Sequence, residues 1–320
     1  MDGRFGIGAL FLAVIAVAVL AVAIHVLTRR GAKKRFGIGD LAIEFTMLAI
    51  CILTLYPVWN ITAISFNNAH DTMLGGIYLW PRKFSMESYR VVFMDRAIMR
   101  AFFITVMRTL IGTVTGVFFT SMVAYAFSKR HIFASRFYLT VGTITMFFGG
   151  GLIPYFILLR SLGLFDTFLV YIIPALFNFF FCIIFMTFFR EIPASLEESA
   201  KIDGANDFFI FIRIILPLST PVIATIALFS GVGHWNDFFA GVMFVNDPDL
   251  QPIQTFLFRV VSGATAKIVV GLPPGITANQ VSSLSVQLAT MVVTTAPIVF
   301  IYPFLQRYFV KGVMIGAIKG

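Results

Sequence analysis

Seven long apolar runs constrain this chain more than any other feature. As a helix, a stretch of about 20 apolar residues crosses the hydrocarbon core of a bilayer. Lipid offers no hydrogen-bond partners, so the backbone of such a run is expected to be helical. Only 12% of the residues are charged, against about 25% in soluble domains. We therefore predict an all-α polytopic membrane protein with spans at about Ile7–Leu27, Leu41–Ile64, Arg100–Ser128, Phe137–Leu159, Phe168–Phe189, Leu216–Val245 and Ser285–Leu305.

The charge distribution predicts how these spans are oriented. The net charge of +9 would suggest nucleic-acid binding in a soluble protein, but the basic residues lie mostly in short loops between apolar runs. An excess of Lys and Arg marks cytoplasmic loops. With residues 28–40, 128–136, 190–215 and 306–320 inside, the inner loops carry 14 Lys and Arg and the outer segments carry 8. This bias predicts an external N-terminus and a cytoplasmic C-terminus.

The first apolar run has two interpretations, a cleaved signal peptide or a membrane anchor. Only Arg4 precedes the run, whereas Arg29-Arg30 and Lys33-Lys34-Arg35 follow it directly. A signal peptide has a positively charged start and a shorter apolar region. We therefore expect an uncleaved anchor, with residues 1–36 forming an extra N-terminal helix and a basic cytoplasmic loop.

One polar-rich segment, residues 190–217, lies between two of the later spans. Ser195 and Glu198, three residues apart, predict a capping box at the start of a short helix. Asp203-Gly204 predicts its end, because glycine tolerates the left-handed conformation of a helix C-terminus. A second helical segment is expected to run from Asn206 to Ile215, and Pro217 is expected to stop or kink it. Its apolar face should comprise Phe208, Phe211, Ile212 and Ile215.

This segment resembles the EAA signature of ABC importer permeases through Glu198-Ser199-Ala200, Asp203-Gly204-Ala205 and Ile215-Leu216-Pro217. Ser199 stands where the family usually has alanine, and both residues are small. The resemblance implies two coupling helices that fit a cleft of a cytoplasmic ATPase. Small residues at 204 and 205 would allow close approach of that partner, and each carboxylate would either pair with it, cap a backbone donor or be solvated. The residues implied in ATPase coupling are Glu197, Glu198, Ser199, Ala200, Asp203, Gly204 and Ala205.

The C-terminus, Tyr302 to Gly320, resembles the ending of carbohydrate-uptake permeases, in particular the branch that imports oligosaccharides derived from complex polysaccharides. Leu55-Tyr56-Pro57 and Trp235-Asn236-Asp237 suit the same branch. The resemblance covers about residues 41–320 and implies a six-helix type I importer domain at 37–320 in a bacterial inner membrane. It also implies a second, similar permease subunit, two ATPase subunits and an external sugar-binding protein.

The sequence contains no recognisable nucleotide-binding or metal-binding motif. No G-x-x-x-x-G-K-[ST] loop is present to cradle phosphates, so we expect no enzyme activity and no bound cofactor in this chain. ATP and Mg²⁺ would be used by the partner ATPases. The four histidines are scattered, and the two cysteines, Cys51 and Cys182, both fall inside predicted spans. Neither a metal site nor a disulfide is expected.

Polar groups at membrane depth are costly and therefore suggest function. Arg108 and Arg100 either pair or extend to the interface, or they face the pathway and meet an anionic sugar. Polar side chains flank the large ring of Trp235 in the sequence His234-Trp235-Asn236-Asp237. This combination suits the binding of a sugar. Alternatively, Trp235 belongs to an interfacial aromatic belt at a polar helix end. We assign Trp235, Asn236, Asp237, Asn178, Tyr155 and Arg108 to a candidate substrate pathway.

The external segments 65–99 and 246–284 are the longest between spans. Trp80-Pro81-Arg82 predicts a turn, and Ser85 predicts the cap of a short helix. Gly271-Leu272-Pro273-Pro274-Gly275 predicts an exposed turn.

The prediction is thus an ATP-driven importer permease that moves an oligosaccharide by alternating access. The oligosaccharide would derive from a complex or acidic polysaccharide. The alternative is an ion-coupled secondary transporter of a small solute. That class requires intramembrane carboxylates, which are scarce here, and it leaves the segment 190–217 without a task.

Overall fold

The structure, a computed structural model, describes residues 38–129, 132–262 and 284–300. Within these ranges all regular secondary structure is helical, apart from one isolated bridge between Asn67 and Phe84. This confirms the all-α prediction. The expected N-terminal span, the turn at 271–275 and the C-terminal motif lie outside the described residues.

Two described helices are long and apolar enough to cross a membrane, α2 (Ile38–Ser65) and α5 (Arg96–Ser128). They confirm the second and third predicted spans, although α5 begins four residues earlier than expected. The last described helix covers residues 284–300, where the seventh span was predicted.

Three further predicted spans are bent rather than straight. The fourth is divided into α6 (Ser135–Phe147) and α7 (Leu152–Ser161), which meet at 116°. Three consecutive glycines end at Gly151, whose φ of 84° favours a residue without a side chain. A continuous span over Phe137–Leu159 was therefore wrong.

The fifth span consists of two 3-10 turns, η1 (Phe168–Tyr171) and η2 (Ile173–Ala175), followed by α8 (Phe179–Glu191) at 45°. Asn178 caps α8 by accepting a hydrogen bond from the Phe181 N–H at 3.1 Å. The sixth span, α12 (Thr220–Asn236), ends nine residues before the predicted Val245, and the short helix α13 (Phe239–Phe244) follows it.

Contacts divide the chain into two compact units. The described part of the first comprises residues 38–95 and 284–293 and includes α2, α3 (Ala69–Met73) and α4 (Glu87–Met94). The predicted helix after Ser85 is α4; its N-cap is Met86, while the Ser85 Oγ accepts a hydrogen bond from the Glu87 N–H at 3.3 Å.

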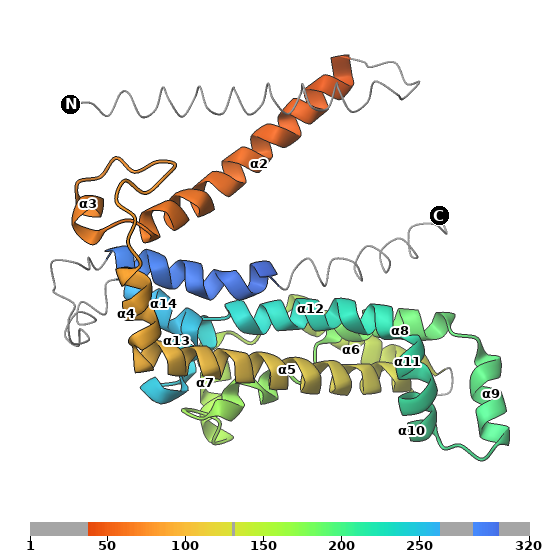
Figure 1. The fold of residues 1–320 in the computed structure, drawn as a ribbon. Coiled ribbons are helices and arrows are strands. Elements are labelled where there is room, and N and C mark those ends of the chain that lie inside the picture. The colour runs from red at the N-terminus through yellow and green to blue at the C-terminus, as the bar shows by residue number, and fades with distance from the viewer. Residues whose placement is uncertain (1–37, 130–131, 263–283, 301–320) are drawn as a thin grey trace. The chain divides into compact units, whose positions relative to one another are not determined.

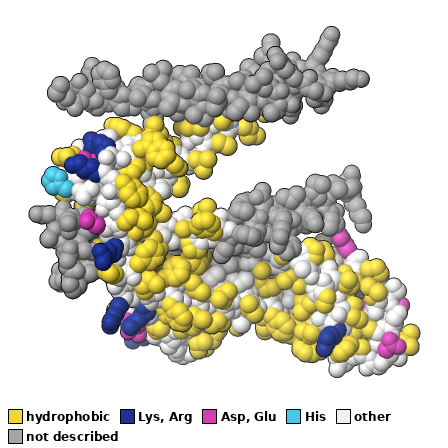
Figure 2. Space-filling model, in the orientation of Figure 1, with side chains coloured by type: hydrophobic (Ala, Val, Ile, Leu, Met, Phe, Trp, Pro, Cys, Tyr) yellow, Lys and Arg dark blue, Asp and Glu magenta, His cyan; other side chains and the backbone are white. Residues whose placement is uncertain are grey.

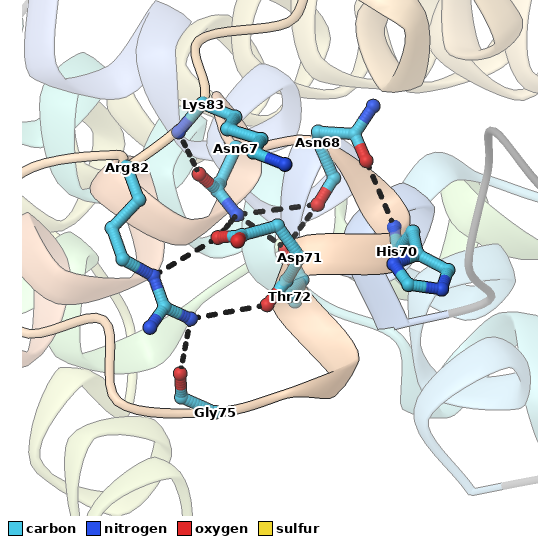
Figure 3. Close-up of polar contacts among 8 residues, drawn as sticks. All are labelled: Asn67, Asn68, His70, Asp71, Thr72, Gly75, Arg82 and Lys83. Atoms are coloured by element: carbon cyan, nitrogen blue, oxygen red, sulfur yellow. Dashed lines mark hydrogen bonds and ion pairs between the residues drawn. The ribbon is translucent and has the colours of Figure 1, made fainter.

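A polar cluster organises the loop that follows α2 in this unit (Figure 3). The Asn67 amide donates to the Asp71 carboxylate at 3.0 Å and accepts from the Lys83 N–H at 2.8 Å. Arg82 Nε donates to the same carboxylate at 3.0 Å. The hydrogen bond from Asn67, together with Arg82, holds the pKa of Asp71 below its usual range. Residues 67–83 are thereby closed into one hydrogen-bonded loop.

The described part of the second unit comprises residues 96–129, 132–262 and 294–300. Here α5 packs along both α12 and α8 (Figure 1). The side chains of Phe185, Phe211, Ile215 and Ile226 are almost fully buried in the core between these helices. The short elements η4 (Pro248–Leu250) and α14 (Ile253–Val261) pack against the N-terminal half of α5.

Hydrophobic side chains also cover much of the surface, and charged side chains gather in a few clusters (Figure 2). On α2, for example, Leu53 and Leu55 are largely exposed. An apolar surface of this extent is expected for helices that contact lipid rather than water.

Candidate functional site

The polar segment between α8 and α12 forms two short helices. The first, α9, runs from Ala194 to Ile202 with Pro193 as its N-cap. The predicted capping box was wrong, because Ser195 and Glu198 lie inside the helix and no side chain caps it. Proline at the start supplies a helical φ and needs no hydrogen-bond partner for its nitrogen, so it sets the boundary before Ser195 is reached.

The corner after α9 follows the prediction. Asp203 is the C-cap and Gly204 has a φ of 83°. The Ala205 N–H donates to Ala200 O at 2.9 Å and the Gly204 N–H donates to Lys201 O at 3.0 Å, the two hydrogen bonds of a Schellman motif. A side-chain atom added at Gly204 would meet nothing within 4 Å. The corner is rigid in its backbone and open on its outer side.

The second helix begins as predicted and then departs from it. Asn206 caps α10 (Asp207–Ile210) by accepting from the Phe209 N–H at 2.8 Å. The next turn, η3 (Phe211–Ile215), is a π-helix, which places one extra residue in the turn and shifts the buried face. Ile210, Phe211 and Ile215 are buried, whereas Phe208 is 60% exposed. The apolar face predicted to include Phe208 was therefore partly wrong.

The break near Pro217 lies two residues later than the proline itself. A three-residue helix, α11 (Leu216–Leu218), precedes Ser219, and the segment up to Leu218 meets α12 at 84°. The predicted kink is thus present at the junction with the membrane helix.

Three of the predicted coupling residues face the protein. Ala200 and Ala205 pack against the core cluster, so their small size serves the seating of the segment on the helices. Glu197 forms an ion pair with Lys129 at the end of α5, and the Lys129 ammonium lies 4.0 Å from the centre of the Tyr125 ring. A second ion pair, Lys201–Asp207 at 3.0 Å, bridges the corner, and its hydrogen bond raises the pKa of Lys201.

The outer side of the segment combines polar and apolar groups. Glu198, Ser199 and Asp203 are exposed, and Ile202 is 87% exposed. Phe208 and Phe209 are also more than half exposed. Exposed apolar side chains rimmed by polar residues are typical of a protein-binding surface.

A cavity of about 430 Å³ lies in the second unit, within the size range of small-molecule sites. Four of the predicted pathway residues line it: Arg108 from α5, Tyr155 from α7, Asn178 before α8 and Asp237 after α12. Tyr171 and His234 also belong to its wall. The imidazole of His234 lies so close to Gly112 that a side chain there would clash with it.

Arg108 and Asp237 form the charged part of this cavity. Arg108 Nη2 donates to Asp237 Oδ2 at 2.6 Å, and Nη1 donates to the Asp237 backbone oxygen at 2.9 Å. The guanidinium carbon lies 4.4 Å from the centre of the Tyr171 ring. Arg108 is therefore paired internally. Arg100 pairs separately with Asp249, which agrees with the expectation that these arginines find partners.

Two predicted pathway residues lie elsewhere. Trp235 is buried, packs edge-on against Phe102 and donates its indole N–H to Thr294 O at 3.1 Å. Asn236 is exposed and does not line the cavity. Asp237 is the C-cap of α12 and has an extended backbone, so its side chain does not continue the helical face that carries Trp235.

The sequence analysis did not single out Tyr171 or Lys129. Pro174, three residues after Tyr171, marks a break inside an apolar run, and such breaks accompany binding sites in transporters. Tyr171 could therefore have been identified from the sequence. Lys129 could not, because a basic residue at the end of a span is common and does not by itself indicate an ion pair.

These features define a helical membrane component that carries an exposed polar segment between α8 and α12 and an internal cavity. Residues 112–315 match the family described as "Binding-protein-dependent transport system inner membrane component". The chain belongs to this family. It is therefore an inner-membrane transport component, and the expected relationship to ABC importer permeases is confirmed.

Similar proteins agree with this assignment. The chain is 36% identical to the polygalacturonan/rhamnogalacturonan transport system permease protein YtcP of Bacillus subtilis, over 88% of this chain and 98% of that one. It is 38% identical to the protein LplC of the same organism, over 84% and 90%. A crystal structure of a bacterial ABC transporter involved in the import of the acidic polysaccharide alginate contains a chain that matches with a TM-score of 0.77 and 28% identity, over 87% and 100%.

Proposed function

We propose that this chain is one of two permease subunits of an ATP-driven importer that moves an oligosaccharide from a complex polysaccharide into the cytoplasm. The similarity to permeases named for polygalacturonan and alginate supports a saccharide substrate. A second, homologous permease would complete the pathway, and a sugar-binding protein would deliver ligand from outside. Two cytoplasmic ATPase subunits, using ATP and Mg²⁺, would supply the driving force.

The observation that carries the proposal is the exposed corner between α9 and α10. Its backbone is fixed by the Schellman hydrogen bonds, its base is attached to α5 through Glu197, and its outer side presents Ile202. A rigid projection with an apolar tip transmits a displacement instead of absorbing it. Closure of the ATPase pair would move this projection and, with it, the membrane helices, as in rigid-body alternation between two states.

This proposal also orients the protein. The corner would lie in the cytoplasm, in agreement with the distribution of Lys and Arg, with the N-terminus outside and the C-terminus inside. The cavity around Asp237 would then belong to the substrate pathway.

Ile202→Glu tests the role of the corner. The side chain has few internal contacts, so the variant should reach the membrane in normal amounts, while a carboxylate at an apolar interface should weaken ATPase docking. We expect ATP hydrolysis stimulated by the binding protein and a polygalacturonan digest to fall on the order of tenfold or more. Ile202→Met is the matched control and should retain stimulation.

Unchanged stimulation in Ile202→Glu would contradict the assignment of the corner. Sugar uptake that persists without ATPase subunits and stops when an ion gradient is removed would overturn the importer itself in favour of a secondary transporter.

A further inference from the structure

The two charges of the cavity differ in accessibility. Only 2% of the Arg108 side chain is exposed, whereas 33% of the Asp237 side chain is exposed. Two nitrogens of the guanidinium are bonded to Asp237, and Nε is buried without a hydrogen-bond partner among the described residues. Arg108 lines the cavity with almost none of its side chain exposed, so a ligand there meets mainly the Asp237 carboxylate.

Asp237 retains hydrogen-bonding capacity toward the cavity. Its Oδ2 accepts from Arg108 and its Oδ1 accepts from the Ala240 N–H at 3.2 Å. An ionised carboxylate offers about four lone-pair positions, so acceptor positions remain. Across the cavity, Asn178 uses Oδ1 to cap α8, which leaves its NH₂ group as a donor. A charged acceptor and a neutral donor are thus among the polar groups of the wall, together with the side chains of Tyr155 and Ser230.

Aromatic rings complete the wall. Tyr155, Phe177 and Phe229 line the cavity and are each more than a third exposed. Their faces suit the apolar C–H face of a sugar ring, while hydroxyl groups at the ring edge suit Asp237 and Asn178. A second carboxylate would meet the exposed Asp237 rather than its buried partner Arg108, and like charges at short range disfavour ionisation of both groups.

We propose that this cavity binds an uncharged, hydroxyl-rich sugar residue, with Asp237 as the ligand-facing acceptor and Arg108 as the residue that positions Asp237. This inference rests on the proposed function and specifies its substrate chemistry at this site. It opposes the alternative in which Arg108 is the counter-ion of an anionic sugar. An acidic chain would place a neutral or neutralised unit in the cavity.

The test uses the assembled importer in lipid nanodiscs without its binding protein, so that only the membrane site is probed. Trigalacturonate and its methyl ester have the same ring hydroxyls and differ in charge. By calorimetry at pH 7 we expect the ester to bind more tightly, on the order of tenfold. Asn178→Asp keeps the acceptor that caps α8 but adds a carboxylate to the cavity, so it should widen this preference severalfold.

Asn236→Asp is the matched control, since it makes the same chemical change at an exposed neighbour outside the cavity and should leave the preference unchanged. Equal or tighter binding of the acid, absence of ester binding, or an identical response of the two variants would overturn the inference. Uptake assays with the binding protein and ATP separate this from the proposed function. Sugar uptake without the charge preference refutes only the site chemistry, and no ATP-dependent sugar uptake refutes the function.

Discussion

Two ion pairs involve α5 or the residue that follows it. Each joins a basic side chain to an acidic one, but the surroundings of the two pairs differ. Arg108, inside the helix, binds Asp237, and Lys129, just beyond its end, binds Glu197. Each cation also lies over a tyrosine ring, Tyr171 or Tyr125 respectively. Arg108 is 2% exposed, while Lys129 and Glu197 are 28% and 21% exposed. If the first pair breaks, the Arg108 guanidinium has no access to water, although Asp237 is 33% exposed, whereas both partners of the second pair are partly exposed.

This difference separates a fixed joint from an adjustable one. Breaking a buried pair leaves an uncompensated charge and costs about 3–5 kcal/mol, so Arg108–Asp237 should hold α5 and the end of α12 together in every state. A partly exposed pair contributes about 1 kcal/mol or less. Lys129–Glu197 can therefore open and re-form at low cost, as the proposed movement of the corner would require.

The largest effect is expected from Asp237→Ala, which leaves Arg108 buried and unpaired. The complex should lose about 3–5 kcal/mol of stability, measured by thermal unfolding in detergent. Replacing both partners, Arg108→Met with Asp237→Leu, should recover most of this loss because no buried charge remains. A double variant no more stable than the single one would show that the pair is not the joint described above.

A smaller effect on stability is expected from Glu197→Ala, about 1 kcal/mol or less. Its effect on function should be larger, because the corner loses its attachment to α5 and the ratio of stimulated to basal ATP hydrolysis should fall severalfold. Exchanging the charges, Lys129→Glu with Glu197→Lys, should restore part of that ratio. Asp207→Ala, which removes the more exposed pair with Lys201, is the control, and an equal loss there would contradict the assignment.

The smallest effect concerns a third pair, Arg82–Asp71, in the other unit. The pKa of Asp71 is lowered in the folded loop, chiefly by Asn67. The resulting stability is present above the unfolded pKa of about 3.9 and is lost as pH falls through the lower folded value. Tryptophan emission should report this, since Trp80 packs edge-on against Trp59. We expect a change only below about pH 4, and its absence in Asp71→Asn.

The sequence could predict what depends on neighbours along the chain. Asp203-Gly204 and Asn206 fixed the corner correctly because a helix C-cap and an N-cap are decided within a few residues. Ser195 failed as a cap because Pro193 offered an earlier start. The π turn at Phe211–Ile215 was not predictable, since it follows from how Phe211 and Ile215 pack against other helices.

The candidate cavity shows the same limit. Arg108 and Asp237 were each identified because charge is costly in a membrane, yet 129 positions separate them and their pairing required the fold. Without that pairing, an anionic ligand for Arg108 remained an open alternative. Trp235 was assigned to the pathway from its polar neighbours, and only the direction of its side chain removes it.

The π turn has a consequence for how related sequences could differ in length at this point. Five residues occupy Phe211–Ile215 where an α-turn holds one fewer, so this turn has the form of a tolerated one-residue insertion. Deleting a single codon there would leave a continuous α-helix rather than a broken one. Each residue turns a helix by about 100°, so every position from the corner to the deletion would rotate by that amount while α12 kept its register. A relative lacking the extra residue would therefore present its corner in a different orientation relative to α12.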